Sequence, residues 1–524
     1  MKHPLQSTFA LLAFLTTAPL AAQLEFGGHP YGLDRALHGL PEPPVVVMGL
    51  VDPAPLLAED AARLAAGMKG PWRYGVNHPT DLRLDNSGVW TALPNGDQVW
   101  QLAIECPGAL NVSFVFDEYI VPEGARVFVH VPSGEQLGAF TAASNGGRHV
   151  MGVAPMPGDR IVIEYIEPAA VAGQGHLHIG EVTHGYRDIL NVTKDLGDSG
   201  ACNNNVICPI GDPWRKQIRS VARIFGSGFL CTGQLLNNCN QNGTPYFLTA
   251  NHCTQGGINP ASAVFRFRWE SPTCTPTQNG PTNMSLSGAQ QLANNAGSDM
   301  ALLELNTTPP DAWDVYYSGW NKTNTPATSV TAIHHPSGDI KKISIEQQPV
   351  SAQPFSGAQC WHIAAWDDGT TEGGSSGSGL WDQHGLLVGQ LYGGQASCSY
   401  NFNDYYGRFD VSFPHIDQFL GNCGDTLTGF DPGATGLSEQ EGTFTFGLVP
   451  NPTTGAVLVT LPERGAGVAV LRVTDALGRV VAERNLVAGT VRTTLDLDGQ
   501  ADGLYLVELR QDGHRVVQRL VLER

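Results

Sequence analysis

Nine of the ten cysteines in this 524-residue chain fall between positions 202 and 423, and this clustering limits how the chain can fold. Cys106 alone precedes the cluster, and no cysteine follows it. Dense cysteines are typical of exported domains, in which disulfides form and persist. The sharp change at Cys202 therefore predicts a domain boundary, with a disulfide-stabilised domain behind it.

The N-terminus predicts export. A short polar start precedes an apolar run from Phe9 to Leu15, and small residues follow from Ala18 to Ala22, so we expect a signal peptide over 1–22. A transmembrane anchor is the alternative, but the apolar run is short and Pro19 interrupts it. No later segment reaches about 18 apolar residues, so we expect no membrane span in the mature form. The net charge of −19 argues against non-specific nucleic-acid binding.

Composition favours a mainly β chain. Charged residues make up only 15% of the chain, glycine (62) and proline (35) are abundant, and long helical runs are scarce. The length suits about three domains. We expect a β-rich sandwich over 23–194, with one short helix near 58–68, a linker over 431–444 and a small antiparallel sandwich over 445–524. Within 195–430 many short strands without helices between them favour a barrel or sandwich, with strands at 220–225, 245–249, 263–267, 301–305 and 386–391.

The stretch TEGGSSGS, residues 371–378, predicts a tight turn that presents backbone N–H groups and a serine hydroxyl to a substrate oxygen. We interpret Ser376 as a nucleophile. A serine hydroxyl is weakly nucleophilic at neutral pH, so this hypothesis needs a base and a group that orients the base. A flexible Gly/Ser loop is the alternative.

Two further residues supply the missing groups. His252 follows an apolar strand and could act as the base, while Asp299 directly precedes another apolar strand and could orient the imidazole. Taken singly, the histidine could be structural and the aspartate could be a turn residue. Their occurrence together with Ser376 favours a catalytic triad.

The three contexts, TANHC at 249–253, DMALL at 299–303 and GSSGS at 374–378, resemble the catalytic motifs of trypsin/chymotrypsin-like serine proteases. Within that class the chain resembles the bacterial lysyl endopeptidase family over most of residues 200–420. The resemblance implies a chymotrypsin-like double β-barrel with the active site between the barrels. Further matching stretches are CNNNVIC at 202–208, CTGQL at 231–235, IHHPSG at 333–338 and DYYGR at 404–408.

The resemblance also assigns roles. Ser376 attacks the peptide carbonyl, His252 takes and returns the proton, and Asp299 stabilises the imidazolium. The N–H groups of Gly374 and Ser376 form the oxyanion hole. The residue before the nucleophile is Ser375 and not aspartate, so trypsin-like activation through a new N-terminal amine paired with that aspartate cannot operate.

Substrate preference is expected to come from outside the serine loop. The position six residues before Ser376, acidic in trypsin, is the uncharged Thr370. The family carries an aspartate just before its Tyr-Gly-Arg motif, and Asp404 occupies that place, so the resemblance implies cleavage after lysine. A turn-capping role is the alternative for Asp404, and Asp367 and Asp368 are rival acids.

Two more substrate-binding residues are expected, Tyr392 and Gly393. The family stacks a histidine and a tryptophan beside the pocket. Here the histidine position is Tyr392, and the tryptophan has no clear counterpart in the sequence. This departure questions the strength of the activity but leaves the type of reaction unchanged.

The resemblance implies disulfides Cys202–Cys398, Cys208–Cys274 and Cys231–Cys253. It leaves three cysteines of the cluster without a partner, Cys239, Cys360 and Cys423. A metal cluster is the rival interpretation of these cysteines and of His334 and His335, but no C-x-x-C or H-E-x-x-H spacing supports it. We therefore expect neither a metal nor another cofactor.

The flanking regions gain roles from the same comparison. Residues 23–194 are expected to be a pro-region, and cleavage at Lys194–Asp195 would suit a lysine-specific enzyme. PNP at 450–452, DALGR at 475–479 and GLY at 503–505 resemble the sorting domain of the type IX secretion system. That resemblance implies contact with export machinery and a secreted or cell-surface protein, which we expect to be a monomer.

The sequence thus predicts a secreted serine endopeptidase that cleaves protein or peptide substrates after lysine. The alternatives are a peptidase of broader or different specificity and a catalytically weak surface-binding protein on a protease scaffold.

Overall fold

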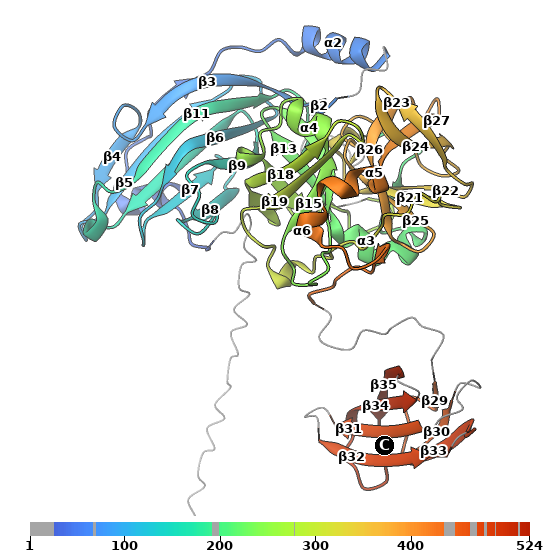
Figure 1. The fold of residues 1–524 in the computed structure, drawn as a ribbon. Helices are drawn as coiled ribbons and strands as arrows, with labels where there is room; N and C mark the ends of the chain where they lie inside the picture. Colours follow the sequence, from blue (N-terminus) through green and yellow to red (C-terminus); the bar gives the residue numbers. More distant parts are fainter. Residues whose placement is uncertain are drawn as a thin grey trace, which may run out of the picture. The chain divides into compact units, whose positions relative to one another are not determined.

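The computed structural model describes residues 26–65, 70–190, 199–276, 278–433, 446–461, 469–475, 479–487, 489–511 and 514–524. The chain forms two compact units, Met1–Gly433 and Ala434–Arg524, and both are built mainly of β-strands (Figure 1). The expected signal peptide, most of the linker and the expected junction at Lys194–Asp195 lie outside the described residues. No described helix is long and apolar enough to cross a membrane.

The N-terminal part of the first unit is a sandwich of two antiparallel sheets with one parallel edge strand, so the β-rich prediction is confirmed. Its core includes Leu102, Phe114, Phe116 and Ile163. The expected short helix is α2 (Pro53–Ala65), which begins earlier than predicted. One sheet contains β1 (Val45–Val47), β4 (Val89–Ala92), β5 (Gln98–Glu105), β7 (Arg126–His130), β8 (Gln136–Phe140) and β10 (Arg160–Glu167), and the other contains β3 (Gly75–Arg83), β6 (Asn111–Ile120), β9 (Met151–Pro157) and β11 (His176–Gly185).

The cysteine-rich part forms two further sheets, which make up the chymotrypsin-like double β-barrel that was predicted. The first runs β17 (Ser285–Ser287), β16 (Val264–Phe267), β13 (Val221–Gly226), β14 (Phe229–Leu235), β15 (Tyr246–Ala250), β19 (Met300–Leu305) and β18 (Ala289–Asn295). The second runs β12 (Asn204–Asn205), β22 (Lys342–Glu346), β21 (Val330–His334), β25 (Gly379–Asp382), β26 (Leu387–Gly394), β27 (Phe402–Arg408), β24 (Ala358–Ala365) and β23 (Ser351–Phe355), with β20 (Trp320–Asn321) and β28 (Thr426–Leu427) beside it.

Strand alternation explains how the two sheets pack together. Successive side chains of a strand point to opposite faces. On β15, Phe247 enters the core of the first sheet, whereas Leu248 joins a second core with Ile333 and Trp381 of the other sheet. The strand β15 therefore contributes to both cores and packs between them.

The C-terminal unit is a small antiparallel sandwich, as predicted. Its core includes Val457, Leu471, Leu495 and Val507. One sheet contains β29 (Gly447–Val449), β30 (Ala456–Thr460) and β33 (Arg492–Asp496), and the other contains β32 (Val480–Leu486), β31 (Ala469–Asp475), β34 (Gly503–Gln511) and β35 (His514–Leu522).

The structure contains the three disulfides that the resemblance implied, Cys202–Cys398, Cys208–Cys274 and Cys231–Cys253. It adds a fourth, Cys239–Cys423, which the sequence left open because the resemblance assigned neither residue a partner. Cys360 and Cys106 are buried free thiols, and burial raises the pKa of each to about 12. Both therefore stay protonated near neutral pH.

Candidate active site

His252 and Asp299 lie together because their strands are neighbours. His252 is in the single turn of α4 (Asn251–Gln255), directly after β15, and Asp299 directly precedes β19. The two strands pair with Ala250 opposite Met300. Asp299 Oδ2 is 2.7 Å from His252 Nδ1, and Asp299 Oδ1 accepts the His252 N–H at 2.9 Å. A buried carboxylate thus holds both the ring and the backbone of His252.

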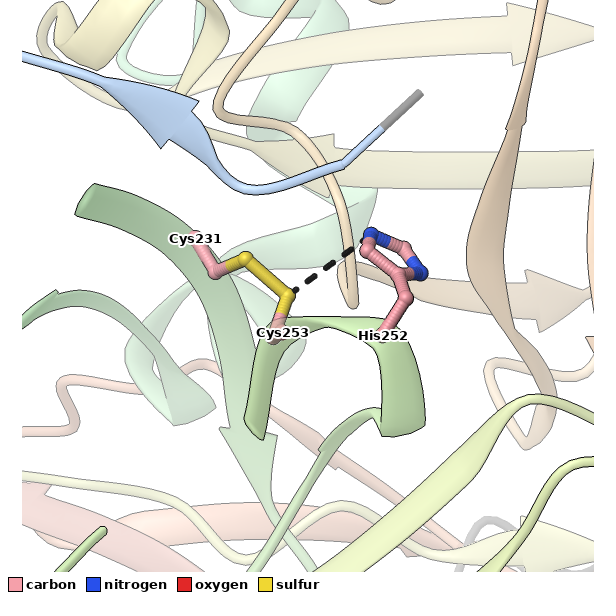
Figure 2. Close-up of side chains that lie close together, drawn as sticks. All are labelled: Cys231, His252 and Cys253. Carbon is pink, nitrogen blue, oxygen red and sulfur yellow. Dashed lines mark hydrogen bonds between the residues drawn. A yellow bond between two sulfur atoms is a disulfide. The ribbon is translucent and has the colours of Figure 1, made fainter. Parts of the chain in front are cut away.

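A disulfide borders the opposite side of the imidazole (Figure 2). Cys253 Sγ lies 3.8 Å from His252 Nε2 and is bonded to Cys231 of β14. These three residues are close enough to suggest a metal site. However, both sulfur atoms are committed to the disulfide, so neither is a free thiolate that could bind a metal. The disulfide instead anchors α4 to β14.

Ser376, in the loop that precedes β25 of the second sheet, lies beside β14 and the Cys231–Cys253 disulfide. Its carbonyl accepts the Thr232 N–H at 2.8 Å and lies 3.8 Å from Cys253 Sγ. The nucleophile candidate is therefore fixed to β14 beside the disulfide that borders His252. Among the described residues, no hydrogen bond joins the Ser376 hydroxyl to His252. Such contacts often tighten only when substrate is bound.

The backbone on either side of Ser375 presents two N–H groups on one turn. The Gly373 carbonyl accepts from Ser337 N at 2.6 Å, and the Ser375 carbonyl accepts from Ser378 N at 3.0 Å. In a trans peptide the N–H points away from the carbonyl, so the N–H groups of Gly374 and Ser376 point away from those partners. No described residue accepts from either group. Gly374 has φ of +94°, a conformation that glycine adopts readily.

Asp404 is fully buried beneath the loop that carries Ser376. Its Oδ2 accepts hydrogen bonds from Trp366 Nε1 at 2.9 Å and from Thr371 Oγ1 at 2.5 Å. Asp404 lies on β27 opposite Gly394 of β26, and a Cβ built on Gly394 would clash with its Oδ1. Gly394 thus leaves room for the carboxylate, and Gly394 itself lines the cavity at Ser376.

The rival acids are exposed and lie elsewhere. Asp367 accepts the Gln347 N–H at 2.8 Å, and Asp368 accepts from Asn204 Nδ2 at 2.6 Å. Each carboxylate therefore stabilises surface chain near β22, and neither is held by the Ser376 loop.

Aromatic rings extend from His252 along the second sheet. Tyr392 stacks on the imidazole with ring centres 5.7 Å apart, and Phe355 meets Tyr392 edge-on at 5.3 Å. Phe355 also stacks on Tyr405 at 4.3 Å. The sequence showed no partner for Tyr392, because Phe355 is on β23, far from any matched motif. Gly393 pairs with Tyr405 in the bulged β26–β27 ladder.

A cavity of about 830 Å³ opens at Ser376 and is lined partly by the N-terminal region. Ser376, Gly373 and Gly394 line it from the protease-like part, and Pro71, Trp72 and Arg73 line it from the other side. The strand β2 (Trp72–Arg73) pairs antiparallel with Leu230 and Phe229 of β14. This segment could not be recognised from the sequence, because nothing in its composition distinguishes it from other turns.

Comparison with known proteins supports both resemblances. Residues 196–407 match the family model described as lysyl endopeptidase, C-terminal domain, and residues 448–523 match the secretion system C-terminal sorting domain. Both resemblances are therefore confirmed. The sorting domain indicates a secreted or cell-surface protein. A lysyl endopeptidase from Pseudomonas aeruginosa is 30% identical over 292 residues, which cover 50% of this chain and 62% of the relative, less than two thirds of its length.

Solved structures of other proteases also align with the chain. A Glu endopeptidase aligns at 17% identity with a TM-score of 0.27, covering 42% of this chain and 96% of the other. The HtrA-type protease AlgW aligns at 13% identity with a TM-score of 0.29, covering 59% and 94%. At these scores the assignment of the fold rests on the strand pairing described above.

Proposed function

We propose that the protein is a secreted serine endopeptidase with Ser376, His252 and Asp299 as its catalytic triad. The observation that carries the proposal is the paired His252–Asp299 contact beside the Ser376 turn, within the region that matches the lysyl endopeptidase model. His252 Nε2 removes the Ser376 proton as Oγ attacks the peptide carbonyl, and then protonates the leaving amine. The N–H groups of Gly374 and Ser376 stabilise the oxyanion.

We propose that the enzyme cleaves after lysine, with Asp404 as the group that pairs with the lysine ammonium. The burial of Asp404 and its place behind Gly394 support this role. A buried carboxylate gains an electrostatic partner when a lysine side chain enters, and a neutral side chain offers no such gain. Tyr392 and Gly393 would line the neighbouring substrate position.

One digestion separates the candidate functions. A protein of mixed sequence is treated with the mature enzyme and with Ser376→Ala, and the new termini are sequenced. We expect cuts after lysine from the first enzyme and none from the second. Cuts after arginine as well would replace lysine specificity with a broader one. Equal inactivity of the two forms, after confirmed maturation, would favour a surface-binding protein on a protease scaffold.

We also propose that residues 23–194 act as a pro-region that covers the cleft. The pairing of β2 with β14 supports this, because that strand edge lies next to Cys231 and the catalytic group. A Cβ on Gly373 would clash with the indole of Trp72, so the ring lies directly on the Ser376 turn. Pro71 packs beside α4, where it would meet a Cβ on Gly256 at 2.9 Å.

The precursor tests this second proposal. Precursor kept uncut by Lys194→Gln should hydrolyse a small lysyl ester more slowly than the mature form, and adding Trp72→Ala should restore part of the rate. An uncut precursor as active as the mature enzyme would contradict a covering role. N-terminal sequencing of the active form should give a start at Asp195, and a distant start would move the junction.

The C-terminal unit, proposed as residues 445–524, would deliver the enzyme to the export machinery. Deleting it should leave enzyme inside the cell envelope, as measured by activity in culture supernatant against activity in lysed cells. Unchanged release of the shortened chain would show that another segment directs export.

A further inference from the structure

The residue before the nucleophile is held by a buried histidine. His334, the last residue of β21, places Nδ1 2.8 Å from Ser375 Oγ and Nε2 3.0 Å from Ser344 Oγ of β22. Ser344 Oγ lies 2.7 Å from the Thr370 carbonyl, and Ser375 Oγ accepts the Glu372 N–H at 3.2 Å. The imidazole therefore connects to both ends of the segment 370–375.

The direction of each hydrogen bond follows from the chemistry of the partners. The Thr370 carbonyl can only accept, so Ser344 donates to it and must accept from His334. Nε2 of His334 therefore carries the proton, and Nδ1 is the acceptor. Ser375 donates its hydroxyl proton to Nδ1 while accepting from Glu372. Each donor in this series of hydrogen bonds has one acceptor, so the network needs a neutral imidazole with a single tautomer.

Burial keeps the imidazole neutral. His334 is fully buried, and the loss of solvation lowers its pKa to about 3. The charged groups that act on it are Asp404, which raises the pKa, and Lys342, which lowers it. The ring can therefore hold the network unchanged over the pH range in which a serine protease works.

We propose that His334 is a positioning residue that sets the conformation of the Ser376 turn through Ser375, in the uncut chain as well as in the mature one. This rests on the proposed endopeptidase function. In trypsin the residue that corresponds to Ser375 is an aspartate, which needs a newly cut N-terminus as its partner. Here His334 is the hydrogen-bond partner of Ser375, so no cleavage is needed. Covering of the cleft, and not disorder of the turn, would then keep the precursor inactive.

Variants of the mature enzyme test each of the two hydrogen bonds of His334, one to Ser375 and one to Ser344. Asparagine can place its Oδ1 near the position of Nδ1 and keep the Ser375 contact, whereas glutamine can place its amide near Nε2 and keep only the Ser344 contact. We expect His334→Gln and Ser375→Ala to lower kcat about 10- to 100-fold with KM within about threefold, because a displaced oxyanion donor acts on the transition state. His334→Asn should lose less.

A double-variant cycle and a control make the test specific. Ser375→Ala combined with His334→Gln should lose little more than either change alone, because both remove the same contact. His384→Gln, at an exposed position, should match the wild type. Additive losses, or a His334→Gln enzyme with wild-type kcat, would overturn the proposal.

A second measurement does not depend on activity. Amide hydrogen exchange in segment 370–376 of the Ser376→Ala precursor should speed up on adding His334→Gln and stay closer to the parent on adding His334→Asn. Unchanged exchange in the glutamine variant would overturn the proposal even if the enzyme proved inactive. An inactive wild type with the expected exchange pattern would instead refute the proposed function and leave the positioning role intact.

Discussion

The candidate site has two sides, one on the first sheet with His252 and Asp299 and one on the second sheet with Ser376 and Asp404, and the two are held in different ways. On the first side, neighbouring strands β15 and β19 bring His252 and Asp299 together, and one short contact between a carboxylate and an imidazole completes the pair. On the second side, the turn that carries Ser376 and the carboxylate of Asp404 depend on buried side-chain hydrogen bonds, between His334 and Ser375 and from Trp366 to Asp404. The first side is thus fixed by strand pairing, and the second by side chains that all have to be in place at once.

The largest effect is expected from a substitution that disrupts the first side. Asp299→Asn should lower kcat about 10⁴-fold for every substrate, because an amide stabilises the wrong tautomer of the base. Steady-state kinetics on lysyl and arginyl esters would measure this, with Ser376→Ala as the inactive reference. A loss confined to lysyl substrates would mean that Asp299 serves recognition and not catalysis.

The next largest effect is expected from a substitution that disrupts the second side, and the loss of activity should depend on the substrate. Asp404→Asn should lower kcat/KM for lysyl substrates about 10²- to 10³-fold, since an entering ammonium would lose its buried partner. Substrates without a basic side chain should change far less. A matched change, Asp367→Asn on the exposed rival acid, should leave lysyl kinetics unaltered. Equal losses on all substrates would indicate that Asp404 supports the fold and not recognition.

The same contrast explains what the sequence could reveal. Motifs around His252, Asp299 and Ser376 could be recognised because each is local, and the apolar runs predicted β13, β15, β16, β19 and β26 but not the other strands of the double barrel. Trp72 on the Ser376 turn and Phe355 against Tyr392 were not readable, because both contacts join elements distant in sequence. The Cys239–Cys423 bridge was not predicted because the resemblance assigned neither cysteine a partner. Distant contacts of this kind follow from how the sheets pack, which a single sequence does not record.

A smaller effect concerns stability in acid. The pKa of His334 is about 3 in the folded protein and near 6.5 when unfolded, so below about pH 6.5 the unfolded state binds a proton that the folded state does not. Stability should fall by about 1.4 kcal/mol per pH unit from this residue between about pH 6 and 3. In a Ser376→Ala background, urea unfolding of His334→Asn should show a shallower decline. Parallel curves would mean that His334 does not contribute.

The smallest expected effect lies where the two sides meet. Tyr392 of the second sheet stacks on His252 of the first, and Phe355 supports Tyr392 edge-on. An edge-to-face aromatic pair contributes about 0.5–1.5 kcal/mol beyond the area that it buries. Phe355→Ala should therefore lower kcat only several-fold, while Phe355→Leu, which keeps the apolar contact, should lose less. A loss as large as that of Asp299→Asn would show that the aromatic contact, and not the carboxylate, chiefly orients the imidazole.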